Sequence, residues 1–472
     1  MEQTPHSSTS PAIRIWTDKN LLSICATSFL VSFMGSALNL ALPKISEDLQ
    51  MNAVMLTWMV TAFLVTTAIF QIPLAKIADI IGRKKTYFCG VALFSISTIG
   101  CGFASSSMMM ILLRILSGIG AAIIFGNGMA ILLSIFPPIY RARVIGINVA
   151  TVYASLAAGP FLGGIITDAL GWHWLFFISG IVGFIALAIA MVFLKGEWTE
   201  AKGEIFDVVG SVIFGIAIFA IIYGFMDIKH LHGIIWLAVG IGATIGFIIY
   251  EKRQIYPVLN IALFSGNRTF TLSTLAAIIN YAATSGLSFM LSLYLQYIRG
   301  FEARHAGIIL ISQACIQCIF ALLTGKLSER FSPSRLATTG MLIICVGLTG
   351  LIFLSNDTPI WIIVMLLLFF GIGFGIFSSP NTNIIMGSVS KHNYGQASAT
   401  TGTARLIGQT FSIGIAGMII SLHLGEHSIT PEVFPDLLAS MKTTFIVFLI
   451  LCLIGVYCST ARIDKNNTEV AE

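Results

Sequence analysis

Long apolar segments separated by short polar stretches run through almost the whole sequence. A helix needs about 20 largely apolar residues to cross the hydrocarbon core of a bilayer. Soluble domains carry about 25% charged residues, and here the charged fraction is 10%. We therefore predict an all-α membrane protein with 14 transmembrane helices and no large soluble domain. The predicted helices span residues 21–43, 53–75, 87–105, 108–136, 144–168, 175–195, 207–226, 233–250, 270–296, 305–324, 336–355, 360–387, 396–422 and 442–460.

The basic residues of the loops predict the orientation in the membrane. With the N-terminus inside, 19 Lys and Arg fall in cytoplasmic segments, 5 fall outside, and 2, Arg114 and Arg405, fall within helices. Cytoplasmic loops carry the excess of Lys and Arg in membrane proteins. We expect a multi-pass protein of the cell membrane with both termini in the cytoplasm.

An internal repeat divides the chain. The stretch LAKIADIIGRKK at 74–85 resembles TGKLSERFSPSR at 324–335, at an offset of 250 residues, and each follows the second helix of a six-helix block. Repeated halves with a binding site between them are typical of secondary transporters. The predicted organisation is a disordered tail (1–20), an N-terminal six-helix bundle (21–195), a linker with two extra transmembrane helices (196–269), a C-terminal six-helix bundle (270–460) and a second tail (461–472).

The repeated loop carries glycine, acidic and basic residues at fixed spacing. Glycine permits a tight turn between helices, and a carboxylate can pair with a basic side chain or with a helix N-terminus. An ordinary cytoplasmic loop would also be basic. The spacing resembles the GxLaDRxGRK loop of the major facilitator superfamily, although Ala75 and Ile80 depart from it. This resemblance implies a gating role for Asp79, Gly82, Arg83 and Lys84, and for Gly325, Glu329 and Arg330 in the second copy.

The helix at 144–168 contains Gly159, Pro160, Gly163 and Gly164. Proline kinks a helix, and glycines let a neighbouring helix approach closely. A generic kinked membrane helix could also contain these residues. The order resembles the antiporter signature GxxxGPxxGG, with Ser155 in place of its first glycine.

Stretches at 251–264, 292–307 and 395–417 extend the resemblance to the fourteen-helix drug/proton antiporters of that superfamily. It implies a secondary active transporter that exports amphipathic drugs or related small molecules by alternating access, as a proton antiporter. One departure from the family pattern affects the expected coupling of transport to protons. Met34 stands where the family commonly has a membrane-embedded aspartate, and no other carboxylate lies deep in a predicted helix.

The candidates for coupling are therefore Arg114, Asp168 and Arg405, each of which could instead be structural. Asp168, Asp207 and Asp227 come nearest to a membrane position and are expected at its interface. Without an acid in mid-membrane, we expect substrates to be neutral, zwitterionic or weakly cationic. Helix positions suggest a cavity lining, for which core packing is equally compatible: Met34, Asn39, Trp58, Gln71, Asn127, Asn280, Tyr281 and Gln409.

Several functions are disfavoured by missing motifs. No GxxxxGK[ST] phosphate loop occurs, and the eight histidines form no metal-ligand spacing or nucleophile triad. We expect no enzyme activity, cofactor, metal or nucleic-acid partner, and a monomer that meets a small-molecule substrate, a coupling ion and the lipid bilayer. An exporter or facilitator of one metabolite, sodium-coupled or uncoupled, is the alternative that Met34 favours. A sensor or scaffold comes third, because no soluble signalling domain is present.

Overall fold

The computed structural model describes residues 18–51, 53–226, 228, 231–301, 303–424 and 434–461, and within these ranges the regular structure is entirely helical. Thirteen of the described helices are long and apolar enough to cross a membrane. A further helix, α4 (Arg83–Gly102), has 20 residues but begins with three basic residues and is rich in Gly, Ser and Thr. The prediction of an all-α membrane protein is confirmed, with a helix count close to the predicted fourteen.

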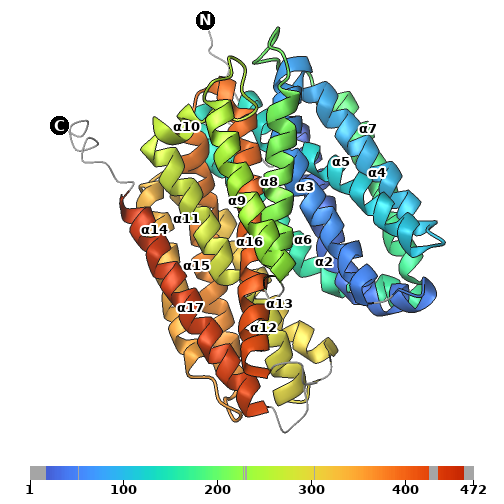
Figure 1. Cartoon of the computed structure of the whole chain (residues 1–472), viewed down its shortest axis with the longest axis vertical. Coiled ribbons are helices and arrows are strands. Elements are labelled where there is room, and N and C mark those ends of the chain that lie inside the picture. The colour runs from blue at the N-terminus through green and yellow to red at the C-terminus, as the bar shows by residue number, and fades with distance from the viewer. Residues whose placement is uncertain are drawn as a thin grey trace, which may run out of the picture.

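The first six long helices form one group, drawn in blue to cyan in Figure 1. Large side chains buried in its core include Phe94, Trp172 and Phe176. The helices are α2 (Lys19–Asp48), α3 (Ala53–Ile81), α4, α5 (Ser107–Ile135), α6 (Arg141–Ala169) and α7 (Trp172–Phe193).

The last helices form a second group with its own core, which includes Phe370, Phe445 and Phe448. Its first span, residues 268–298, is interrupted at Ser285 and Gly286 and ends in a π-helical turn. The helices are α11 (Arg268–Thr284), α12 (Leu287–Leu293), α13 (Ala303–Leu327), α14 (Pro333–Ile352), α15 (Ile360–Gly387), α16 (Tyr394–Leu424) and α17 (Phe434–Ala461).

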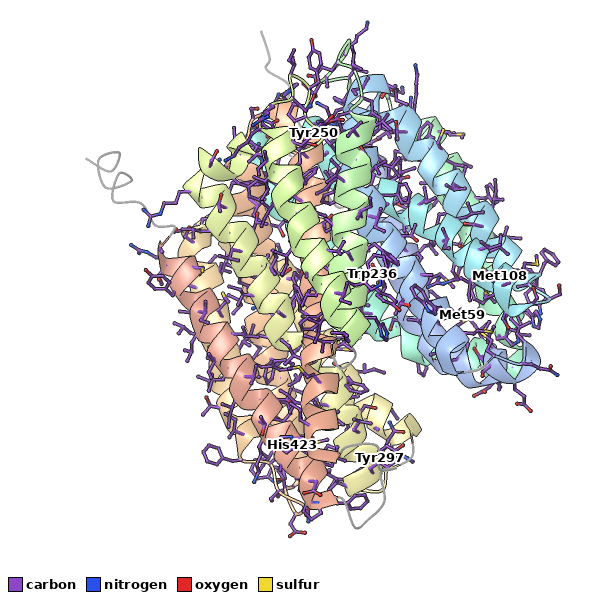
Figure 2. The ribbon with its side chains drawn as sticks, viewed as in Figure 1. Met59, Met108, Trp236, Tyr250, Tyr297 and His423 are labelled. Atoms are coloured by element: carbon purple, nitrogen blue, oxygen red, sulfur yellow. The ribbon has the colours of Figure 1, made fainter. Side chains whose placement is uncertain are left out.

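Two helices between the groups form a hairpin, α8 (Val208–Met226) and α9 (Leu231–Glu251), shown in green in Figure 1. On α8, Phe214 and Ile218 are buried against α3 and against Leu406 of α16. Trp236 of α9 lies beside α8 (Figure 2), edge-on to Phe219. Most of the outer face of α9 is exposed and apolar, so we expect lipid to cover it.

The two groups meet at one end of the molecule, which we call the basic end because it carries the basic connections and the adjoining helix ends at 82–85, 137–143, 194–207, 326–335 and 388–394. Figure 1 shows the blue and red groups converging there and diverging toward the other end. Six helices carry most of the contact, since α6 packs against α13 and α15, and α16 packs against α3 and α5. The repeated loops lie at this same end.

Candidate functional site

The first copy of the repeated loop forms a buried ion pair. Gly82 turns the chain between α3 and α4 with φ of +124°, a left-handed value that favours glycine. Nε of Arg83 donates to Oδ1 of Asp79 at 2.6 Å, and the two side chains are 0% and 3% exposed. The same guanidinium donates to Ser134 Oγ at 3.1 Å and, across the two groups, to the carbonyl of Lys391 at 3.4 Å. The ion pair therefore joins both halves.

The carboxylate of Asp79 lies against the beginning of α16. A Cβ added to Gly395 would lie 2.6 Å from both of its oxygens. Negative charge is favoured at a helix N-terminus because the orphan N–H groups and the helix dipole are positive there. Only glycine lets Asp79 come this close to α16.

The segment between α7 and α8 crosses the loop. The backbone N–H of Ala201 donates to the carbonyl of Asp79 at 2.9 Å. The carboxylate of Glu197 accepts the N–H of Lys84 at 2.8 Å, and Lys76 pairs with Glu204 at 2.5 Å. These three contacts therefore fix the first copy of the loop to the segment between α7 and α8.

The second copy of the loop also reaches the opposite half. Gly325 at the end of α13 packs against Gly146 of α6, where a Cβ would lie 2.9 Å from the Gly325 Cα. Nη2 of Arg143 donates to Glu329 Oε2 at 2.8 Å, whereas Arg330 is exposed. Both copies therefore make contacts across the two groups at the basic end.

The glycines of the antiporter-like segment pack within the first group. A Cβ on Gly163 would lie 2.7 Å from that of Ala37, and one on Gly159 would lie 2.6 Å from Ser36 Oγ. Gly164 is partly exposed, and the side chain of Pro160, within α6, lies outside the described residues. Here the glycines bring α6 close to α2.

The three candidates for coupling lie in different parts of the structure. Arg114 is buried, its Nε donates to the carbonyl of Met59 at 3.2 Å, and its guanidinium lies 4.3 Å from the Phe63 ring centre. Both partners belong to α3, on which Figure 2 labels Met59. Asp168 pairs with Lys44 at 2.8 Å near the end of the first group opposite the basic end. Arg405 lies on α16, between the two groups.

We expect Asp168→Asn to transport at close to the wild-type rate and to melt within about 2 °C of it, because an exposed ion pair contributes at most about 1 kcal/mol. The side chains of Asp168 and Lys44 are 79% and 47% exposed. Initial transport rates in liposomes and a melting curve of the purified variant test this expectation. A loss of transport with an unchanged melting curve would instead assign Asp168 a part in coupling.

The candidate cavity residues divide by exposure. Gln71, Asn127 and Asn280 are fully buried, and both polar atoms of Gln71 and of Asn280 have no hydrogen-bond partner among the described residues. Gln71 lies against Gly402 of α16, while Met34 is buried in the core of the first group. The side chain of Asn39 lies outside the described residues. The partly exposed members are Trp58, which stacks on Tyr223 of α8, and Tyr281 and Gln409.

Sequence reasoning missed an aromatic cluster between the groups. The ring of Phe374 lies 5.4 Å from Tyr281 and 5.9 Å from Tyr153, centre to centre. Phe125 of α5 lies 4.8 Å below the guanidinium of Arg405. Tyr153, a tyrosine in the middle of an apolar helix, was the sequence signal that could have indicated this cluster.

A second missed feature is a buried carboxylate at the basic end. Glu251, the last residue of α9, is 2% exposed, and its carboxylate faces the backbone N–H groups of Val258 and Leu259. It lies beside Asp207, because both carboxylates contact the same Gly210 of α8. Tyr250, labelled in Figure 2, donates to Asp207 Oδ1 at 3.3 Å. Among the described residues no group of His, Cys, Asp and Glu could hold a metal ion.

Curated relatives cover most of the chain. It is 28% identical to the riboflavin transporter RibZ of Clostridioides difficile, over 84% of this chain and 86% of that protein. It is 30% identical to the multidrug transporter protein MdtP of Bacillus subtilis, over 88% and 78%. It is 26% identical to the methylenomycin A resistance protein of the same species, over 95% and 97%.

Solved structures share the fold at low identity. The proton:xylose symporter XylE aligns with a TM-score of 0.69 at 13% identity, over 95% of each chain. The human organic anion transporter MFSD10 aligns with a TM-score of 0.66 at 13% identity, over 96% of this chain and 100% of that one. The family description "Major Facilitator Superfamily" matches residues 24–412 and 273–469. With its two groups of helices joined by repeated loops, this chain belongs to the Major Facilitator Superfamily of membrane transporters.

Proposed function

We propose that this transporter exports amphipathic drugs or related small molecules across the cell membrane by alternating access, as a proton antiporter. The observation that carries the proposal is the placement of both loop copies, which contact the opposite half at the basic end. An interface held by a few polar contacts at one end can exchange with an interface at the other end. Relatives named for multidrug transport and for methylenomycin A resistance support export.

The orientation and the domain boundaries belong to the same proposal. The positive-inside rule assigns the basic end and both termini to the cytoplasm, so the interface described above would close the cytoplasmic side. Bundles at 21–195 and 270–460, joined by 196–269, would rock against each other. We propose a single chain as the working unit, with no cofactor.

Proton coupling needs a group that can bind and release a proton inside the protein. Asp79 is already paired with Arg83, and Met34 supplies no carboxylate. Glu251 is buried without a basic partner among the ion pairs of the described residues and lies beside Asp207, next to the segment that contacts the first loop. We therefore propose Glu251 as the proton-binding residue.

The test uses purified protein in liposomes that contain a pH-sensitive dye, to which lipophilic cations, neutral drugs and aromatic acids are added in turn. We expect substrate-dependent proton movement opposite to the substrate, and at least a tenfold loss of it in Glu251→Gln. The matched control is Glu47→Gln, which changes an exposed glutamate on α2 and should behave as wild type.

Export of a single metabolite is the second candidate, favoured by Met34 and by a relative named as a riboflavin transporter. It predicts uptake of a radiolabelled compound without proton movement in the same liposomes. That result, with or without a sodium requirement, would overturn the antiport proposal.

A further inference from the structure

Arg405 is a mid-membrane cation that has no anionic partner in the part of the chain that the structure describes. It lies eleven residues into α16, which places it about 16 Å along the helix from the basic end. Its side chain is partly exposed, and its guanidinium lies over the Phe125 ring of the other group. Among the described residues no carbonyl or carboxylate accepts a hydrogen bond from it or pairs with it.

Arg114 and Arg405 differ in their hydrogen bonding, which indicates a structural role for Arg114 and leaves Arg405 available to bind a substrate. Arg114 is 3% exposed, and the Met59 carbonyl accepts its Nε–H. An arginine keeps its charge in proteins and presents five N–H donors in a planar fork. Among the described residues the Arg405 fork lies over an aromatic face and donates no hydrogen bond, so its donors remain available to a bound molecule.

The surroundings of Arg405 fit a flat aromatic body. Tyr281 packs against Gly408, one turn along α16, and stands edge-on to Phe374. Phe125, Tyr281 and Gln409 are all partly exposed. Aromatic rings bind flat apolar groups by burial and stacking, and a guanidinium binds carboxylates through two parallel hydrogen bonds.

Acidic groups that could attract a cationic substrate lie elsewhere. The two buried carboxylates that the structure describes, Asp79 and Glu251, both lie at the basic end. A substrate cation near Arg405 would therefore face a like charge without a counter-ion.

We propose that Arg405 binds the anionic group of a planar aromatic substrate, with Phe125 and Tyr281 beside the ring system. The proposal rests on the export function above and names its substrate class as aromatic organic anions. It moves the expected substrates away from the neutral and weakly cationic molecules that the sequence suggested.

Binding of three probes that differ in one group tests the proposal: 2-naphthoate, its neutral amide, and 2-naphthylmethylammonium. We expect calorimetry on the purified protein to show naphthoate binding about ten- to a hundredfold more tightly than the other two. Arg405→Gln should lose this preference, and Arg405→Lys should keep part of it, because lysine retains the charge but not the fork. Arg335→Gln, which alters an exposed arginine at the basic end, should bind as wild type.

Equal binding of all three probes, or an unchanged preference in Arg405→Gln, would overturn the anion site. So would a result in which chloride alone binds in an Arg405-dependent way, since that indicates an inorganic anion. Binding does not depend on export, so an Arg405-dependent preference with no transport of any compound would refute the proposed function and leave the site standing.

Discussion

Asp79→Asn is expected to abolish most transport while the protein still folds. The carboxylate of Asp79 pairs with Arg83, which in turn bonds the carbonyl of Lys391 in the other half. Breaking one partner of a buried ion pair costs about 3–5 kcal/mol. Because the pair contributes to the contact at the basic end, its loss should shift the equilibrium away from the closed arrangement by about a hundredfold or more.

Two measurements check this expectation. One is the initial transport rate in liposomes. The other is maleimide labelling of a cysteine placed at Ser398, which is buried at the basic end and bonds the Phe125 carbonyl, after the exposed Cys89 and Cys315 are changed to serine. Labelling should rise in Asp79→Asn and stay low in Asp168→Asn, which alters the exposed ion pair. Normal transport and low labelling in Asp79→Asn would contradict a gating role for the loop.

Gly146→Val is expected to be inactive for a steric reason. A Cβ at this position would lie 2.9 Å from the Gly325 Cα and 3.1 Å from the Ala321 carbonyl oxygen, both of which are backbone atoms of the other half. Backbone cannot move aside as a flexible side chain can, so α6 and α13 could not approach to their present distance. Each core stays intact, so we expect a folded protein held open at the basic end, with transport at least about a hundredfold below wild type.

The matched control for this variant is Gly242→Val. Gly242 lies on α9, and a Cβ there would meet nothing within 4 Å. We expect the control to transport normally and the same Ser398→Cys reporter to be labelled only in the Gly146 variant. Should Gly146→Val export substrate at the control rate, the contact between α6 and α13 would not be part of the cycle.

The sequence predicted the membrane-crossing segments well because each apolar run had to be long enough for the bilayer. The run at 233–250, for example, corresponds to α9 at Leu231–Glu251. The repeat offset of 250 residues related Asp79 to Glu329, and both lie at the basic end, Asp79 in the last turn of α3 and Glu329 just after α13. The length of an apolar run and the charge of a loop depend only on the order of residues, so the sequence alone is enough to predict them.

The orientation of side chains around each helix could not be predicted in the same way. Asn280 is buried while its neighbour Tyr281 is partly exposed, and successive residues on a helix point about 100° apart. Lipid and protein core are equally apolar, so the hydrophobic pattern does not separate the two faces. Arg405 and Phe125 are 280 residues apart in the chain, and only the fold brings them together.

The hairpin of α8 and α9 makes the two flanks of the transporter unequal toward the bilayer. It covers the seam where α3 meets α16, whereas the described residues place no further helix over the seam of α6 with α13. A hydrophobic molecule diffusing within the membrane therefore meets a shielded flank on one side and a bare one on the other. Any lateral entry from the lipid would have to use the flank of α6 and α13.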